Sequence, residues 1–382
     1  MLILGIETSC DETALGLLLA EGELFKPTFS IIGEKISSQT EIHAPWGGVV
    51  PNLAKREHNK NLLPLLDELI KETKNLEKEI VVLSQEEKKE IQNILSREEK
   101  TAELLLAWLE KNPKPKIDLI AVTSGPGLEP ALWAGINFAK ALSIAWQIPI
   151  IGANHLVGHL FSPWLAGHNP QFPFLGLIIS GGHTELAIIR SFTDYQIIGS
   201  TRDDAIGEAF DKVARLLGLP YPGGPAISEL AKKNKTRKEI FNLPRPMINS
   251  QDFDFSFSGL KTAVLYIIKK KEKLDEKEKI AMADGFEKAV GDILAKKAIN
   301  ALEKYNLKTL VVGGGVSANS ALREILKEKL TNYNNKTKIY FPETKYSTDN
   351  ALMIAQAGYF KFLKDGQDNL DKLIANGNLS LK

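Results

Sequence analysis

The fold is decided by the stretch FLGLIISGGHTELAII, residues 174–189, which predicts an apolar strand, a turn of small residues and a returning strand. The N-terminal residues 2–20 follow the same plan. An apolar run, Leu2–Ile6, leads into a polar turn that ends in Thr13, and a second apolar run, Ala14–Ala20, follows. We interpret this recurrence as an internal repeat. It predicts two related lobes, each containing a strand, a tight turn and a second strand.

Two such lobes, with a ligand held between their hairpins, are the plan of the superfold shared by actin, acetate kinase and the heat-shock ATPases. The chain has 382 residues, enough for two domains. Its 43% hydrophobic and 25% charged residues are typical of a globular protein. Because the formal net charge is only +1, an RNA partner would need a local basic patch or a second subunit to bind it.

Three features of the sequence indicate the cellular compartment in which the protein is expected. Cys10 is the only cysteine, so an intramolecular disulfide is excluded. The N-terminus has no basic segment of the kind that begins a signal peptide. No stretch approaches 18 uncharged apolar residues, the length that spans a membrane. We therefore expect a cytoplasmic protein without membrane contact.

A candidate metal site begins with two imidazoles, His155 and His159, four residues apart. On a helix these side chains share one face, a spacing that suits two ligands of Zn or Fe. Two structural histidines are the alternative. Leu156 occupies the place where a His-Glu-x-x-His metalloprotease carries its general base, which argues against peptidase chemistry. Asp349 is the candidate third ligand, and its alternative role is the N-cap of the helix expected at Ala351–Phe362.

A second candidate site follows a predicted strand, Leu310–Val312. The glycine loop Gly313–Asn319 comes next, and then a helix is expected from about Ser320 to Leu330. Strand, glycine loop and helix form a nucleotide-binding context, because helix N-termini favour anionic groups. Ala318 breaks the Gly-x-Gly-x-x-Gly pattern and no Walker lysine is present.

Taken together, the motifs resemble those of the bacterial TsaD family, the tRNA N6-adenosine threonylcarbamoyltransferases, formerly described as O-sialoglycoprotein endopeptidases. The resemblance covers nearly the whole chain in family order. It is carried by residues 5–13, 47–51, 56–58, 125–128, 154–159, 180–184, 210–212, 221–225, 255–261, 313–319 and 348–350.

The resemblance implies an α/β protein with the actin-like (ASKHA) two-lobed fold and duplicated ribonuclease-H-like cores. It implies transfer of a threonylcarbamoyl group from threonylcarbamoyl-AMP to N6 of the adenosine that follows the anticodon. His155, His159 and Asp349 would bind one divalent metal, usually iron, with Zn or Mg as alternatives. The adenylate would be held by Ile178, Ile179, Ser180, Gly181, Gly182, Asp211, Gly224 and Asn319. Asp11, Glu12 and His183 match further polar site positions, and their chemical roles stay open.

The resemblance also implies partners and a domain plan. The expected partners are tRNA, a TsaB-like paralogue and a TsaE-like ATPase. We expect a first lobe at residues 1–153, a second lobe at 154–349 that carries the metal and adenylate motifs, and C-terminal helices at 350–382 that return to the first lobe. A charged helical insertion is expected at about 71–114, since this stretch is rich in Lys and Glu.

Some residues depart from the family pattern. The insertion looks longer than the usual connection, and Ser228 stands where some members carry an aspartate that contacts the ligand. Two alternative functions follow. One is a diverged ATPase or kinase of the same superfold, which would not need the histidine pair. The other is a non-catalytic paralogue, but such paralogues typically lose the metal ligands and the C-terminal glycine loop, both of which this chain keeps.

Overall fold

The computed structural model describes residues 1–24, 26–73, 76–235 and 240–381. The chain forms two compact units. Unit 1 consists of Met1–Gly167 together with Asp349–Leu381, and unit 2 consists essentially of His168–Thr348. In the described part of the chain, no helix has the length and apolar character needed to cross a membrane.

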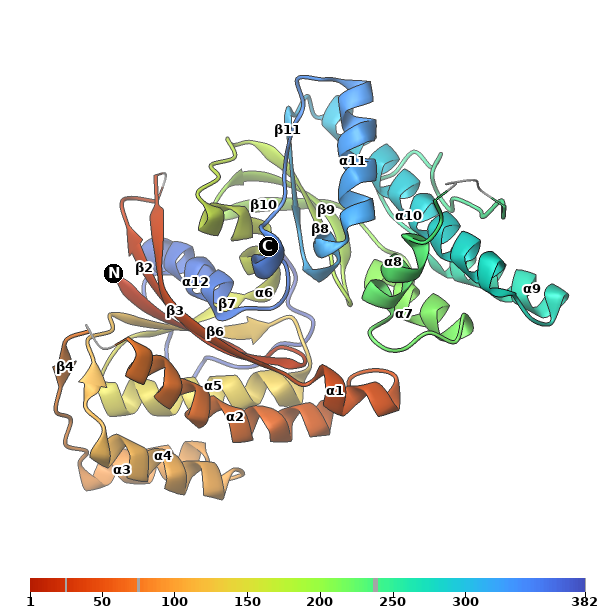
Figure 1. The fold of residues 1–382 in the computed structure, drawn as a ribbon. Helices are drawn as coiled ribbons and strands as arrows, with labels where there is room; N and C mark the ends of the chain where they lie inside the picture. Colours follow the sequence, from red (N-terminus) through yellow and green to blue (C-terminus); the bar gives the residue numbers. More distant parts are fainter. Residues whose placement is uncertain (25, 74–75, 236–239, 382) are drawn as a thin grey trace. The chain divides into compact units, whose positions relative to one another are not determined.

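Unit 1 is built on a five-stranded sheet (Figure 1). Its strands are β1 (Leu2–Glu7), β2 (Glu12–Glu21), β3 (Thr28–Ser38), β6 (Leu119–Gly125) and β7 (Ile150–Asn154), in the order β3-β2-β1-β6-β7. The first three strands run antiparallel to their neighbours, while β1, β6 and β7 are parallel. The predicted N-terminal hairpin is therefore β1–β2, with its polar turn at residues 8–11.

Helices cover both faces of this sheet. On one face, Leu4 and Ile6 of β1 join a buried core with α2 (Pro51–Glu72) and α5 (Glu129–Trp146). On the other face lies α12 (Ala351–Asp365), so close to β1 that a Cβ on Gly5 would lie 2.0 Å from the carbonyl oxygen of Ala351. Glycine is therefore required at this crossing. The shorter elements of this unit are α1 (Thr40–His43), η1 (Ala44–Trp46), α6 (His155–Phe161) and η2 (Ser162–Ala166).

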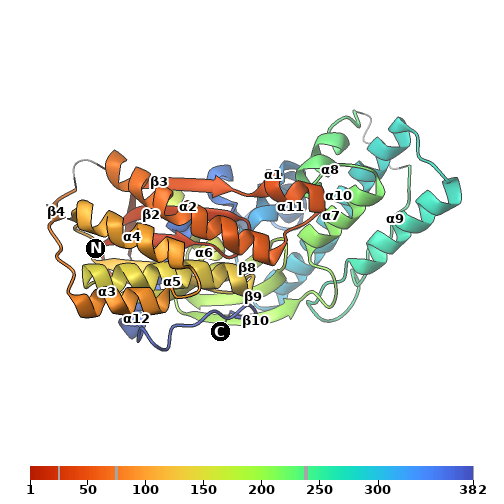
Figure 2. The same ribbon diagram turned by 90° about the horizontal axis from the view of Figure 1, so that it is seen from below.

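The charged stretch forms two helices, α3 (Gln85–Ile94) and α4 (Glu99–Lys111), that lie beside α2 and α5 (Figure 2). A two-stranded ribbon of β4 (Lys78–Glu79) and β5 (Lys114–Pro115) closes its base. Ser84 starts α3 with a capping box, in which its hydroxyl accepts from the Glu87 N–H and the Glu87 carboxylate accepts from the Ser84 N–H. Ile91 and Leu105 anchor the pair of helices in the unit 1 core.

Unit 2 repeats the sheet of unit 1. Its strands are β8 (Phe174–Ile179), β9 (Thr184–Ser191), β10 (Asp194–Ser200), β11 (Thr309–Gly313) and β12 (Lys338–Tyr340), in the order β10-β9-β8-β11-β12. The antiparallel and parallel pairings match those of unit 1 strand for strand. Two sheets with one topology confirm the predicted duplication of ribonuclease-H-like cores.

The unit 2 helices bury one face of this sheet. They are α7 (Ile206–Leu216), α8 (Gly223–Ala231), α9 (Ser258–Lys271), α10 (Glu276–Lys304) and α11 (Ser320–Tyr333), with the 3₁₀ turns η3 (Gly315–Ala318) and η4 (Thr344–Tyr346). Leu175 and Leu177 of β8 pack in the same core as Phe286 and Leu294 of α10. The long α10 begins with a capping box between Asp275 and Glu278.

The boundary between the units differs from the predicted one at residue 153/154. Unit 1 continues to Gly167, because α6 and η2 pack against elements of the first sheet and against α12. Gly158 meets Met353 of α12, and the ring of Phe161 lies 5.4 Å from that of Phe360. The predicted metal ligands His155, His159 and Asp349 therefore lie in unit 1 and not in the second lobe, where the sequence analysis put all three.

Candidate functional site

The histidine pair begins a short helix that its own sequence defines. Asn154, the last residue of β7, caps α6 by accepting hydrogen bonds from the N–H groups of Leu156 and Val157 at 2.8 and 3.2 Å. This cap starts the helix at His155, so His155 and His159 stand one turn apart on the same side. Their rings lie 4.5 Å apart and nearly perpendicular.

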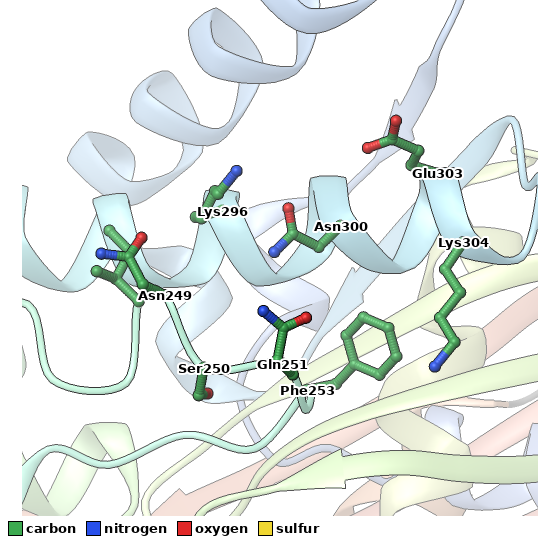
Figure 3. A pocket seen from close by; sticks show the side chains of 9 residues that line it. Asn249, Ser250, Gln251, Phe253, Lys296, Asn300, Glu303 and Lys304 are labelled. Atoms are coloured by element: carbon green, nitrogen blue, oxygen red, sulfur yellow. The ribbon is translucent and has the colours of Figure 1, made fainter.

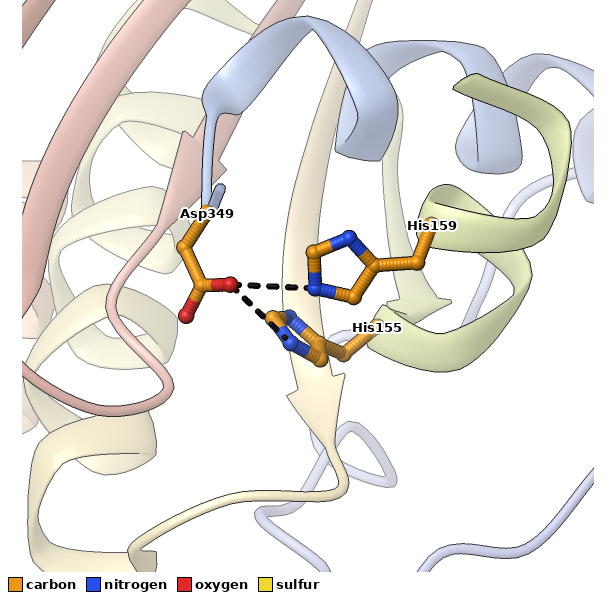
Figure 4. Close-up of side chains that lie close together, drawn as sticks. All are labelled: His155, His159 and Asp349. Atoms are coloured by element: carbon orange, nitrogen blue, oxygen red, sulfur yellow. Dashed lines mark hydrogen bonds and ion pairs between the residues drawn. The ribbon is translucent and has the colours of Figure 1, made fainter. Parts of the chain in front are cut away.

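Asp349 faces the two imidazoles (Figure 4). Its Oδ1 lies 3.0 Å from Nε2 of His159 and 3.5 Å from Nε2 of His155. The N-cap role left open for Asp349 belongs instead to its neighbour Asn350, whose side chain accepts from the Met353 N–H at 2.9 Å. The carboxylate of Asp349 is therefore free to point at the histidines.

The three side chains are grouped as a candidate metal site. One ligand atom from each lies within 4.8 Å of the others, and donors about 2.1 Å from one ion lie roughly 3–3.5 Å apart. Nδ1 of His155 lies 2.9 Å from Oε2 of the buried Glu7, so it donates its proton there and leaves Nε2 available as a ligand. Nδ1 of His159 is buried and has no partner in the described part of the chain, so its polar contact is through Nε2.

The pKa values of the three side chains are shifted by burial and by their charges on one another. Burial disfavours a charged His155, but Asp349 and Glu7 outweigh burial and raise its pKa to about 9. Burial would likewise raise the pKa of Asp349, but the two histidines lower it to about 2. The pKa of His159 is lowered by burial and by the neighbouring His155. The cluster thus holds an ionised carboxylate against imidazoles. A divalent cation can take the place of the proton that these groups share, because metal binding releases protons from its ligands.

The turn between β1 and β2 lies close to this cluster. Burial, together with Asp349 and Asp11, raises the pKa of Glu12 to about 10. Burial and Asp11 raise the pKa of Cys10. The hydroxyl of Ser38 donates to Oε1 of Glu12 at 3.3 Å. The predicted residues Asp11 and Glu12 therefore belong to the same acidic environment as Asp349 in unit 1.

The other predicted residues lie in unit 2. The turn after β8 is closed by two hydrogen bonds, from the Ser180 N–H to the His183 carbonyl at 2.9 Å and from the His183 N–H to the Ser180 hydroxyl at 3.1 Å. A Cβ on Gly181 or Gly182 would have no heavy atom within 4 Å, so the backbone of the turn is open. Ile178 and Ile179 are buried and can contribute only their backbone groups.

Two glycines from other segments pack against this turn. A Cβ on Gly207, at the start of α7, would lie 2.7 Å from Cα of Gly181. Gly314, which has the left-handed φ of 92°, would place a Cβ 2.4 Å from the Ile179 carbonyl oxygen. Only glycine fits at either position. The C-terminal glycine loop is thus brought beside the turn, as its position after the parallel strand β11 requires.

Asp211 and Gly224 meet at the start of α8. Oδ1 of Asp211 accepts from the Gly223 N–H at 2.7 Å, which fastens α7 to α8. A Cβ on Gly224 would meet no heavy atom within 4 Å. The space beside Gly224 at this helix start is therefore open.

Asn319 and Ser228 share a partner that the sequence analysis missed. Nδ2 of Asn319 donates to Oε1 of Glu287 at 2.7 Å and to the Ser228 hydroxyl at 2.8 Å, while the Ser228 hydroxyl donates to the same Glu287 oxygen at 2.5 Å. Oδ1 of Asn319 caps α11 through the Leu322 N–H. Glu287 is 3% exposed, and burial raises its pKa. A glutamate on the apolar face of α10 is unusual, and this feature of the sequence could have identified Glu287.

Glu7 is the second residue that the sequence analysis did not single out as a site residue. A charged residue at the end of a fully buried strand is unusual, and this feature of the sequence could have identified Glu7 as a site residue.

A surface pocket in unit 2 lies between α10 and residues 248–253, with Lys304 placed 5.2 Å from the centre of the Phe253 ring (Figure 3). None of the predicted site residues lines this pocket.

Comparison with known proteins decides the family. The family model described as TsaD, tRNA N6-adenosine threonylcarbamoyltransferase, matches residues 30–83 and 99–356. The chain belongs to the TsaD family. It is accordingly a transferase of tRNA modification, with tRNA as its substrate. The residues between the two matched ranges, 84–98, contain α3.

Two relatives in the TsaD family match along 92–100% of their length. The tRNA N6-adenosine threonylcarbamoyltransferase of Thermosipho africanus is 42% identical over 381 residues, covering 100% of each chain. That of Persephonella marina is 42% identical over 369 residues, covering 96% of this chain and 92% of its own. Among solved structures, T. kodakarensis HypF superposes with a TM-score of 0.50 at 12% identity, over 72% of this chain and 45% of that one. This likeness concerns the fold alone, which is the actin-like ASKHA fold.

Proposed function

We propose that the chain transfers the threonylcarbamoyl group from threonylcarbamoyl-AMP to N6 of the adenosine 3′ of the anticodon, in tRNAs that read codons beginning with A. The observation that carries the proposal is the convergence of His155, His159 and Asp349 in a chain of the TsaD family. A non-catalytic paralogue would have no need to maintain this cluster with its supporting Glu7.

The reaction is acyl transfer to a weak nucleophile. The N6 amine attacks the carbonyl carbon of the threonylcarbamoyl group, the bond from that carbon to the phosphate oxygen breaks, and AMP leaves. The amine loses its proton after attack, so a strong general base is not required. The protein must orient the amine and stabilise charge on the carbonyl and phosphate oxygens.

We infer that unit 2 binds the adenylate. The open backbone of Gly181 and Gly182 can donate to phosphate or carbonyl oxygens, and the start of α8 at Gly224 favours an anionic group. Asp211 orders that helix start through Gly223. The family resemblance adds Asn319 to the residues that bind the adenylate. Glu287 orients the Asn319 side-chain amide by accepting a hydrogen bond from it. We keep Asp11, Glu12 and His183 as site residues without a chemical role.

We infer that His155, His159 and Asp349 hold one divalent metal, Fe²⁺ first and Zn²⁺ second. Two imidazoles and one carboxylate suit either ion, whereas Mg²⁺ prefers oxygen ligands. When bound, such an ion supplies Lewis-acid chemistry with open coordination positions. Glu7 orients the His155 ring by accepting its Nδ1 proton.

The family resemblance further suggests that the chain acts in the cytoplasm with a TsaB-like paralogue and a TsaE-like ATPase. The test is to purify the chain anaerobically with these partners and supply threonylcarbamoyl-AMP with unmodified tRNA. Threonylcarbamoyladenosine is then measured by mass spectrometry of the nucleosides. The His155→Ala/His159→Ala variant is compared with His168→Ala, which changes an exposed histidine outside the site.

We expect product from the wild type and from the His168 variant, and none from the double variant. Absence of product from a folded, metal-loaded wild type with its partners would refute the transferase proposal. Full activity in the double variant would refute the role of the histidine pair and leave the transferase standing.

A further inference from the structure

Trp46 stands out among the five tryptophans of the chain. Its side chain is 69% exposed, whereas Trp108 and Trp133 are half-buried and Trp146 and Trp164 are buried. A tryptophan that covers no core contributes little to folding. Tryptophan is enriched at interfaces, because its ring offers a large apolar surface and its N–H a hydrogen-bond donor.

The loop that carries Trp46 is held rigidly. His43, three residues earlier, is buried and sits in a chain of hydrogen bonds: its Nδ1 accepts from the Val50 N–H at 3.3 Å and its Nε2 lies 3.1 Å from Oε1 of Gln39. Gly47 adopts the left-handed φ of 66° and its N–H donates to the Ala44 carbonyl at 3.0 Å. A side chain presented by an ordered loop loses little entropy on binding.

The same hydrogen bonds connect the loop to the polar turn between β1 and β2. The Gln39 N–H donates to the Asp11 carbonyl at 2.8 Å, and the Gln39 side-chain amide reaches Nδ1 of His58 at 3.2 Å. His58 in turn donates from Nε2 to the Cys10 carbonyl at 3.0 Å. The loop of Trp46 and the turn beside the metal-ligand cluster are thus one connected structure within unit 1, and α1 lies next to the tip of the β1–β2 hairpin (Figure 1).

We propose that Trp46 stacks on an unpaired base of the tRNA anticodon loop and so positions the acceptor adenosine. This inference rests on the proposed function. Enzymes that do chemistry on a nucleobase act on an unpaired or flipped-out base, because they cannot reach the target atom inside a duplex. Proteins recognise unpaired bases by stacking them on aromatic side chains.

Arg56 supplies a cation in the same segment. It is exposed, lies in the second turn of α2, and has no carboxylate partner among the ion pairs of the described residues. An unpaired guanidinium suits a phosphate of the RNA backbone. The indole ring of Trp46 can stack on a base, and the guanidinium of Arg56 can bind a phosphate. The segment therefore offers a contact for the base and a contact for the phosphate of single-stranded RNA.

The test measures binding of a labelled, unmodified tRNA transcript to the full chain with its partners, by fluorescence anisotropy. Trp46→Ala should weaken binding by roughly 5- to 150-fold, the usual loss for removal of one stacked base contact. Trp46→Phe should stay within about threefold of the wild type, because phenylalanine also offers a ring face. Leu104→Ala, which removes an exposed apolar side chain on α4, is the matched control and should change nothing.

Transfer kinetics separate this role from a structural one. In Trp46→Ala the KM for tRNA should rise while the KM for threonylcarbamoyl-AMP, the metal content and the melting temperature stay at wild-type values. Unchanged tRNA binding in Trp46→Ala would overturn the proposal, and so would a loss confined to association with the TsaB-like partner, since the surface would then be a protein interface. If the wild type itself forms no product, the proposed function fails, an outcome distinct from an active wild type with an unaffected variant.

Discussion

Oε2 of Glu7 lies 2.9 Å from Nδ1 of His155, and the same oxygen accepts the Thr123 hydroxyl at 2.7 Å. Oε1 of Glu7 accepts the Ser9 N–H at 2.5 Å. A carboxylate at the end of β1 is thereby fixed by three donors and holds one imidazole with its Nε2 toward Asp349. Contacts of this kind orient metal ligands and set their basicity.

Glu7→Gln should weaken metal binding by about 10- to 100-fold. Ser9 donates to Oε1, whereas Thr123 and His155 both donate to Oε2, so one amide oxygen cannot accept from all three. An NH₂ group in place of Oε2 faces the Nδ1 proton of His155, and one in place of Oε1 faces the Ser9 N–H, so two donors repel in either orientation. Metal content after dialysis against a graded chelator series measures the loss. Glu23→Gln, a change of an exposed glutamate in the same unit, is the control, and equal metal retention in the two variants would contradict the role assigned to Glu7.

His58 should make the fold sensitive to acid. Its Nε2 donates to the Cys10 carbonyl and its Nδ1 accepts from the Thr13 hydroxyl at 2.8 Å, so the neutral ring has both nitrogens bonded, and burial lowers its pKa to about 4. The unfolded chain binds a proton near pH 6.5 and the folded chain only near pH 4. Stability from this residue is therefore full above about pH 6.5 and is lost as the pH falls toward 4.

The expected loss between pH 7.5 and pH 5 is about 2 kcal/mol. Urea unfolding of the wild type and of His58→Gln at both pH values measures it, because the glutamine variant cannot take up this proton. His168→Gln should keep the wild-type pH dependence. The assignment fails if His58→Gln shows the same change with pH as the wild type.

Ser228→Asp should destabilise unit 2. The Ser228 hydroxyl lies 2.5 Å from Oε1 of the buried Glu287, so aspartate would place two carboxylates in contact. We expect a loss of about 2 kcal/mol in the free energy of unfolding at pH 7.5. The loss should shrink as the pH falls, because protonation of one carboxyl removes the repulsion.

A double variant tests this explanation. Ser228→Asp/Glu287→Gln removes one of the two charges and should recover most of the lost stability, while Ser228→Ala, which loses only a hydrogen bond, should cost about 1 kcal/mol. Urea unfolding gives all three values. If the double variant is no more stable than Ser228→Asp alone, the penalty arises elsewhere than at Glu287.

Local sequence patterns predicted those parts of the site that lie close to each other along the chain. Asp349, 190 residues from His159, was a candidate with an alternative role as an N-cap, and the family resemblance paired it with the histidines. The spacing of His155 and His159, and the glycine turn after a strand, are local patterns, and local geometry determines both. The sequence analysis missed Glu7 and Glu287 because each contacts a site residue more than 30 positions away in the chain, His155 and Asn319 respectively. No sequence periodicity links such pairs. The unit boundary was misplaced for the same reason, since α12 reaches α6 across nearly 200 residues.

Gly207→Ala should impair binding of threonylcarbamoyl-AMP without affecting the metal. A Cβ at this position would lie 2.7 Å from Cα of Gly181 and 2.8 Å from the Ser180 carbonyl oxygen, so the turn after β8 must shift. A displaced turn misaligns its backbone donors, and we expect the KM for threonylcarbamoyl-AMP to rise about tenfold. Steady-state kinetics measure the change, and metal content should match the wild type because the ligands lie in unit 1. Gly259→Ala, where the added Cβ has at least 3.4 Å of room, is the control. A wild-type KM in Gly207→Ala would show that the turn does not contact the donor.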